Sequence, residues 1–149
     1  MTSMQRNLVY DGRGSEWVAS VVLLGFAIVL ALPDDTLKSS AGFAGFIQFG
    51  FDDASLAVPI AAIAVLRIAA LVVNGNWHRS PMLRLFGAVI GSVLFTMIGV
   101  AFWWPAMANG AAFSTGGGTY LVLALFDALS AYRSGADVRM VQQLSARAE

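Results

Sequence analysis

The chain has 149 residues, enough for a single domain, and 58% of them are hydrophobic whereas only 12% are charged. Because an ordinary soluble domain is about 25% charged, this composition excludes a normal water-facing surface and indicates that a bilayer surrounds the protein. The formal net charge of zero provides no basic face, so no nucleic-acid binding is predicted. The lack of cysteine in the sequence excludes disulfides and thiolate chemistry.

Four apolar runs follow one another along the chain, each close to the roughly 20 residues that a helix needs to cross the hydrocarbon core. They predict transmembrane helices at 17–32, 54–73, 83–104 and 110–132, with Pro33 and Pro105 ending the first and the third. Arg6 and Arg13 before the first run also suit a signal peptide, but "ALPDD" is a poor cleavage site and favours a retained helix. The predicted fold is all-α, a single polytopic membrane domain of residues 1–149.

Lysine and arginine are divided unevenly between the predicted sides of the membrane. One side holds seven of them, counting Arg84 at the edge of the third helix. These seven lie in segment 1–16, in the connection between the second and third helices, and in tail 133–149. The opposite side holds only Lys38, and Arg67 lies within the second run. Because basic residues stay on the cytoplasmic side, we predict a bacterial inner-membrane protein with both termini in the cytoplasm.

The outer segment 34–51 begins with an Asp35-Thr36 capping signal and is rich in phenylalanine. It predicts a short helix lying at the membrane interface, and the alternative is a loop that packs into a partner protein. The predicted interfacial anchors, including two tryptophans at the outer end of the third helix, are Phe43, Phe46, Phe49, Trp103 and Trp104.

Arg67 stands in an otherwise apolar run, where a charge costs about 2.5–3.5 kcal/mol on insertion scales. Asp127 is the single acid within a predicted membrane run, and it lies at a matching depth because the second and fourth helices run in the same direction. We therefore expect an Arg67–Asp127 contact, direct or through water, that locks helices together and does not conduct. Arg84 is the competing partner for Asp127, Ser130 is a further candidate member, and snorkelling of Arg67 is the other alternative.

Two small-residue motifs have structural interpretations. Gly87-x-x-x-Gly91 permits close approach of another backbone. "STGGGTY" at 114–120 lacks the lysine of a phosphate-binding loop, so we expect a flexible helix start capped by Ser114 or Thr115.

A cytoplasmic turn is expected between the second and third helices. Asn74-Gly75 is a turn signal, and Pro81 suits the first turn of a helix. His78 and Arg79 lie between them. His78 is interpreted as a polar interfacial residue, because one histidine cannot build a metal site alone.

Several motifs occur in a fixed order: Asp35-Thr36 after the first helix, "LRIAALVVNGNWHRSP" at 66–81, "STGGGTY" at 114–120 and "DALSAYRSGADVR" at 127–139. In this order the chain, over roughly residues 30–139, resembles small membrane proteins carried by tailed bacteriophages and prophages. The resemblance implies a setting more than an activity. The matching residues are Arg67, Asn74, Gly75, Pro81, Arg84, Asp127, Tyr132 and Arg133.

Three functions remain open. The first is a phage-encoded membrane factor that oligomerises or binds a partner, such as a holin-like pore former or a factor for DNA entry or virion assembly. The second is an accessory subunit of a host membrane complex, and the third is a small proton or cation transporter that uses Asp127. No enzyme, cofactor or metal site is predicted, and the expected partners are the lipid bilayer, further copies of the chain or other membrane proteins.

Overall fold

The computed structural model describes residues 3–76 and 81–146, and every regular element in these two ranges is a helix. The four long helices are α1 (Ser3–Leu30), α4 (Asp53–Asn76), α5 (Pro81–Asn109) and α6 (Thr115–Ala146). Three short elements separate α1 from α4, namely α2 (Thr36–Ser39), η1 (Ala41–Phe43) and α3 (Ala44–Gln48). The all-helical prediction is therefore confirmed.

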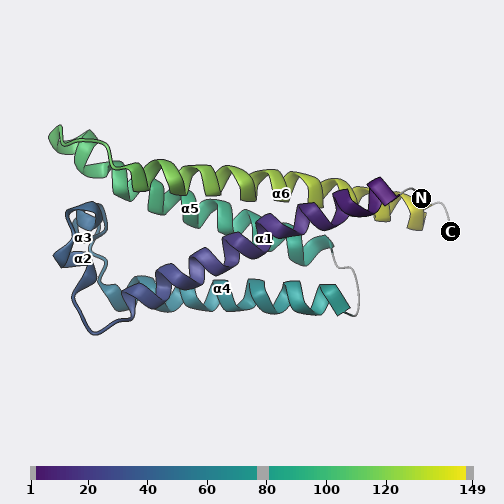
Figure 1. Cartoon of the computed structure of the whole chain (residues 1–149), viewed down its shortest axis with the longest axis horizontal. Helices are drawn as coiled ribbons and strands as arrows, with labels where there is room; N and C mark the ends of the chain where they lie inside the picture. Colours follow the sequence, from purple (N-terminus) through teal and green to yellow (C-terminus); the bar gives the residue numbers. More distant parts are fainter. Residues whose placement is uncertain (1–2, 77–80, 147–149) are drawn as a thin grey trace.

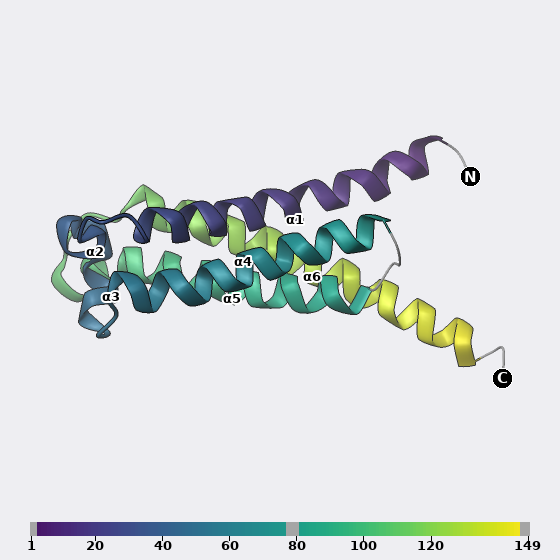
Figure 2. The ribbon, with the colours of Figure 1, turned by 90° about the horizontal axis from the view of Figure 1, so that it is seen from below.

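The long helices form two closely packed pairs, α1 with α4 and α5 with α6. Successive long helices run in opposite directions, so both chain ends lie at the same end of the bundle (Figures 1 and 2). The short elements and the α5–α6 connection lie at the other end (Figure 1). We call these the terminal end and the cap end.

The first helix begins well before the predicted position. It starts at Ser3, whereas the predicted membrane span starts at residue 17, so the described part of segment 1–16 belongs to the same helix and its location in the cytoplasm stays a prediction. The buried side chains of α1 recur every three or four residues, which is the period of one helix face. They are Glu16, Ala19, Ser20, Leu23, Phe26, Ala27 and Leu30.

We expected the third long helix, α5, to end at Pro105, but it continues to Asn109. A proline has no N–H, so the carbonyl of Ala101, four residues earlier, loses its helical donor. Gly45 of α3 packs against this carbonyl so closely that a Cβ atom on Gly45 would overlap it. Packing of the cap thus occupies the site that Pro105 leaves open.

The fourth helix begins at Thr115 and not at residue 110. Gly110 ends α5 in the left-handed region, with φ of 68°, and its N–H donates to the Ala106 carbonyl at 3.1 Å. The Ser114 hydroxyl accepts the N–H of Gly116 at 3.2 Å, so the expected serine cap is confirmed. The helix continues past residue 132, the predicted end of the membrane span, to Ala146.

Within the described ranges, two helices are long and apolar enough to cross a membrane, by length and composition. These stretches are Asp53–Val73 in α4 and Met82–Asn109 in α5. The apolar part of α1, Gly14–Leu30, is shorter. The structure therefore supports two of the four predicted spans directly.

Segment 34–51 is not a single helix at the membrane surface but a folded cap on the bundle. Phe46 is 1% exposed, so the prediction that it anchors the segment in lipid was wrong, whereas Phe43 is half-buried and its anchoring role stays a prediction. They join an aromatic cluster whose ring centroids lie 5.0–6.2 Å apart. Its other members come from α1, α5 and α6 and are Phe26, Phe102 and Tyr120.

The remaining predicted anchors lie at the edge of the cap. Phe49 is 55% exposed and packs on Trp104 with ring centroids 5.0 Å apart. The Trp104 indole N–H donates to the Gln48 side chain. The indole N–H of Trp103, which is also partly buried, donates to the Ser114 carbonyl at 2.9 Å. These three aromatic residues therefore hold loops in place.

Hydrogen bonds at the start of α4 attach the cap to this helix. Asp52 and Ser55 form a reciprocal capping box, in which the Asp52 carboxylate accepts the N–H of Ser55 at 2.7 Å and the Ser55 hydroxyl accepts the N–H of Asp52 at 2.9 Å. The Asp53 carboxylate accepts the N–H of Leu37 in α2 at 3.1 Å. Asp35 makes no side-chain capping bond, contrary to expectation, and pairs with Lys38 at 3.2 Å.

Candidate functional site

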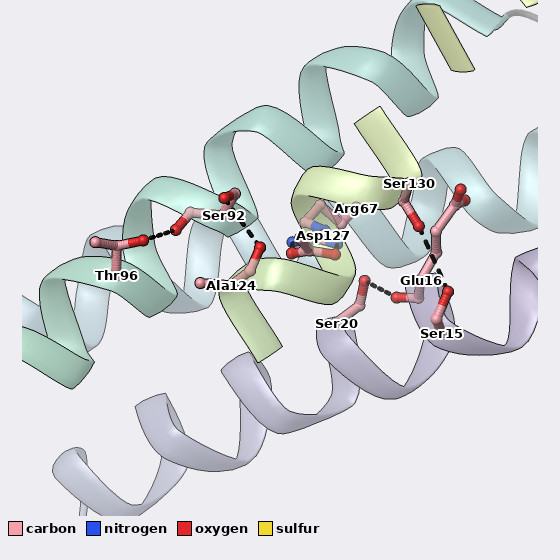
Figure 3. A network of polar contacts seen from close by, with 9 residues as sticks. All are labelled: Ser15, Glu16, Ser20, Arg67, Ser92, Thr96, Ala124, Asp127 and Ser130. Atoms are coloured by element: carbon pink, nitrogen blue, oxygen red, sulfur yellow. Dashed lines mark hydrogen bonds and ion pairs between the residues drawn. The ribbon is translucent and has the colours of Figure 1, made fainter. Parts of the chain in front are cut away.

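Arg67 of α4 and Asp127 of α6 form a bidentate ion pair in the interior (Figure 3). The two guanidinium NH groups donate to the two carboxylate oxygens at 2.7 and 2.9 Å. Both side chains are almost fully buried, at 6% and 2% exposure. The expected contact is therefore present and direct, and its geometry is the strong parallel form of an arginine–carboxylate bond.

The sequence suggested Arg84 of α5 as a competing partner for Asp127. In the structure Arg84 pairs instead with Glu16 of α1. Its Nη2 donates to Glu16 Oε1 at 2.7 Å and its Nε to Oε2 at 3.1 Å. Glu16 was not predicted as a site residue because it precedes the apolar run that begins at residue 17. The signal that identifies it is the helical spacing of Glu16 with Ser20 and Leu23 on one face of α1.

Glu16, Arg67, Arg84 and Asp127 form what we call the charge cluster, and each comes from a different long helix. The two ion pairs do not link helices within a closely packed pair. One joins α4 to α6 and the other joins α1 to α5, so each connects the α1–α4 pair to the α5–α6 pair. The charge cluster is therefore placed to hold the two halves of the bundle together.

Two glycines of α5 make room for Arg67. Its aliphatic stem passes Gly87, and a Cβ atom at Gly87 would lie 3.5 Å from Arg67 Cγ. At Gly91 a Cβ atom would overlap both the guanidinium and the Asp127 carboxylate. The Gly87-x-x-x-Gly91 motif thus accommodates a charged side chain, whereas the sequence suggested the close approach of another backbone.

Hydroxyl groups extend the polar region along the bundle (Figure 3). Ser130 was expected to join Asp127, but its hydroxyl lies 3.4 Å from that of Ser15 on α1. Ser92 of α5 donates to the Ala124 carbonyl of α6 at 3.0 Å. The Ser134 hydroxyl is buried and has no hydrogen-bond partner in the described part of the chain.

A small crevice of about 20 Å³ lies beside the charge cluster, between α4 and α5. This volume suits one water molecule. Its charged lining consists of Glu16, Arg67 and Arg84, whereas Asp127 lies behind Arg67 and does not line it. Its apolar walls are Ala70, Leu71, Leu83, Gly87 and Ala88.

The other predicted positions fall around the α4–α5 connection. Asn74 and Gly75 lie within α4, which continues to Asn76, so the prediction of a turn at these two residues was wrong. Pro81 is the first residue of α5, as expected. His78 and Arg79 lie outside the described residues. Within the described ranges, no group of three histidine or acidic side chains is arranged to hold a metal ion.

Comparisons with protein-family models, with curated proteins and with solved structures found no match to this chain. The functional conclusion therefore depends on the charge cluster and on the distribution of apolar side chains around it.

Proposed function

We propose that this chain is a four-span protein of a bacterial inner membrane, with both termini in the cytoplasm. It acts without catalysis, by binding another membrane protein or further copies of itself. The phage or prophage setting is part of this proposal and is supported by the resemblance of motifs alone. An accessory subunit of a host membrane complex would have the same physical properties.

The observation that carries the proposal is the inverted distribution of polar and apolar side chains. All four members of the charge cluster point inward and are paired. The outward faces of all four long helices carry large apolar side chains, including Val21 and Ile28 on α1, Val58 and Leu66 on α4, Phe86 and Val93 on α5, and Val122 and Leu125 on α6. A lipid environment explains such a perimeter, whereas a water-soluble helix bundle of this kind would aggregate.

The same distribution supports four spans although α1 and α6 are less apolar in sequence than α4 and α5. Glu16 lowers the mean hydropathy of α1, and Asp127 lowers the mean hydropathy of α6. Both carboxylates are nevertheless buried in ion pairs with arginines inside the bundle and do not face lipid. Val21 on α1 is 57% exposed and Leu125 on α6 is 60% exposed, comparable with Val65 on α4 at 55%. Inward-facing charges in spanning helices are tolerated when they pair with each other.

The geometry favours a binding role over ion conduction. A proton or cation carrier needs a carboxylate that exchanges its ligand, but both oxygens of Asp127 are held by Arg67. Toward the cap end the interior is filled by Phe95 and Ile98, each 0% exposed. We therefore assign the charge cluster a structural role, which agrees with the expected locking of helices.

The first test separates a pore from a partner-binding protein. The chain is expressed in a bacterium while membrane potential and turbidity are followed, and the membrane-extracted protein is then sized in mild detergent. We expect the potential to stay intact and the protein to be recovered in a complex of fixed stoichiometry. Abrupt depolarisation at a set time would favour a holin-like pore, and a proton flux lost in a folded Asp127→Asn variant would favour a transporter. Either result would contradict the assignment of a binding role without ion conduction.

A second test addresses topology and uses the lack of cysteine in the sequence. Single cysteines are introduced at Ser40, in the cap, and at Arg139, near the end of α6, and are labelled with an impermeant thiol reagent from the outside of spheroplasts. The proposed topology requires labelling at Ser40→Cys and protection at Arg139→Cys until the membrane is opened. The reverse pattern would contradict the orientation, and labelling at both positions would contradict the number of spans.

A further inference from the structure

We propose that the crevice between α4 and α5 is a binding site for an anionic phospholipid, with the lipid phosphate at its mouth beside Arg84. This inference rests on the proposed membrane topology. Its experimental test is designed so that the two proposals can fail separately.

Among the described residues that line the crevice, arginines outnumber acids, although the charge cluster as a whole is neutral. Two arginines line the crevice against one acid, Glu16, because Asp127 contacts Arg67 from the other side. Arg84 is also the most accessible of the four charged side chains, at 20% exposure compared with 6% or less for the others. An anion that approaches from the perimeter therefore meets Arg84 first.

The surroundings of the crevice select an amphipathic anion. Its walls are apolar, and Leu83 both lines it and is 51% exposed, so the wall continues onto the lipid-facing surface. The cavity itself, at about 20 Å³, holds a water molecule but not a phosphate group. The phosphate therefore sits at the mouth with its acyl chains along the outer surface of α4 and α5, and a water molecule fills the space toward Arg67.

The position along the bundle agrees with such a ligand. Arg84 and Leu83 lie in the first turn of α5 and Leu71 in the last two turns of α4, close to the terminal end. In the proposed topology this end is cytoplasmic, and basic pockets between helices on that side bind anionic headgroups. The arginines that set the proposed orientation would thus face the same leaflet as the lipid.

The test compares lipid occupancy of the purified full-length protein in nanodiscs that contain equal shares of phosphatidylglycerol and phosphatidylcholine. Retained lipid is identified by native mass spectrometry. We expect phosphatidylglycerol to be preferred about fivefold, as one accessible arginine near an anionic surface implies. Leu83→Trp, which fills the mouth and leaves all four charges in place, should reduce this ratio to about one.

Matched controls separate the site from a general effect of surface or charge. Leu125→Trp makes the same substitution at a 60% exposed position on α6, away from the crevice, and Arg133→Gln removes an exposed arginine of α6. Both should keep the preference. Adding inorganic phosphate to the nanodiscs should not displace the lipid, because the apolar walls contribute to its binding.

The outcomes that would overturn the inference are distinct. The inference is rejected if the parent protein retains both lipids equally or if Leu83→Trp leaves the lipid ratio unchanged. It is also rejected if Leu125→Trp abolishes the preference to the same extent as Leu83→Trp, or if inorganic phosphate displaces the lipid. Retention of each variant in carbonate-washed membranes is measured first. Parent protein released by this wash would reject the proposed function together with the site, whereas retained protein without lipid preference would reject the site alone.

Discussion

The guanidinium group of Arg67 lies against the backbone of Gly91, with no space for a side chain between them. The ion pair between α4 and α6 crosses α5 at this point, so the absence of a Cβ atom on α5 is a condition for the contact. This relationship connects a small-residue motif to a buried charge.

Gly91→Ala should strongly destabilise the bundle, by about 3 kcal/mol, because the new methyl group overlaps Arg67 and Asp127 and leaves their charges imperfectly paired. The measurement is thermal unfolding in detergent, followed by circular dichroism. The matched control is Gly25→Ala on α1, where nothing lies within 4 Å of the added Cβ atom. That control should be neutral or slightly stabilising, because alanine favours a helix. Equal effects of the two substitutions would contradict the close approach.

Removing one partner of the Arg67–Asp127 pair should be worse than removing both. Arg67→Leu leaves a buried carboxylate without its counter-ion and should cost about 3–5 kcal/mol, whereas Arg67→Leu with Asp127→Leu should recover much of this loss. Membrane abundance and melting temperature of the three proteins provide the comparison. A double variant no better than Arg67→Leu alone would show that the charges do more than neutralise each other.

The second ion pair should respond asymmetrically to the loss of each partner. Glu16 is 4% exposed in its side chain and Arg84 is 20% exposed, so Glu16 depends more on its partner than Arg84 does. Arg84→Ala should therefore cost about 3 kcal/mol and Glu16→Ala only about 1 kcal/mol. Chemical or thermal unfolding of both variants in the same detergent tests this order, and the reverse order would contradict the assigned burial.

Gly45→Ala should loosen the cap, because the added Cβ atom overlaps the carbonyl of Ala101 in α5. The expected result is faster proteolytic cleavage between residues 34 and 51, with the helical content of the long helices preserved. Gly14→Ala, where nothing lies within 4 Å of the added Cβ atom, is the control. Unchanged cleavage in Gly45→Ala would mean that the cap does not depend on this contact.

The capping box of α4 predicts a measurable titration. The backbone N–H of Ser55, followed by its hydroxyl, holds the pKa of Asp52 below its ordinary value of 3.8 by stabilising the carboxylate. The contribution of this group to stability is present above that value and is lost as the pH falls through the lowered pKa of the folded protein. Ser55→Gly removes the hydroxyl but keeps the backbone N–H, so it should raise the pKa of Asp52 only part of the way toward 3.8, as followed by carboxyl NMR. An Asp52 pKa that is the same in both proteins would contradict the capping box.

The sequence by itself determined the class of fold and one half of the charge cluster. Long apolar runs predict helices because, apart from closed barrels, only helices satisfy their backbone hydrogen bonds in lipid. The 1.5 Å rise per residue placed Arg67 and Asp127 at one depth. Local chemistry was also readable where it involves neighbours in the chain, as in the Ser114 cap. These features depend on composition and on distances along a single helix.

The tertiary structure decided which helices meet and which side chains they bring together. Glu16 is paired with a residue 68 positions away, and although its helical spacing places it on the buried face of α1, no local pattern names Arg84 as its partner. Phe46 is inside the protein and Phe49 is outside although both belong to one phenylalanine-rich segment. The pattern of residues along a helix determines the depth of a side chain and the helix face on which it lies. The partner of that side chain depends on packing between helices, because the space left by glycines such as Gly91 and Gly45 determines which groups can approach.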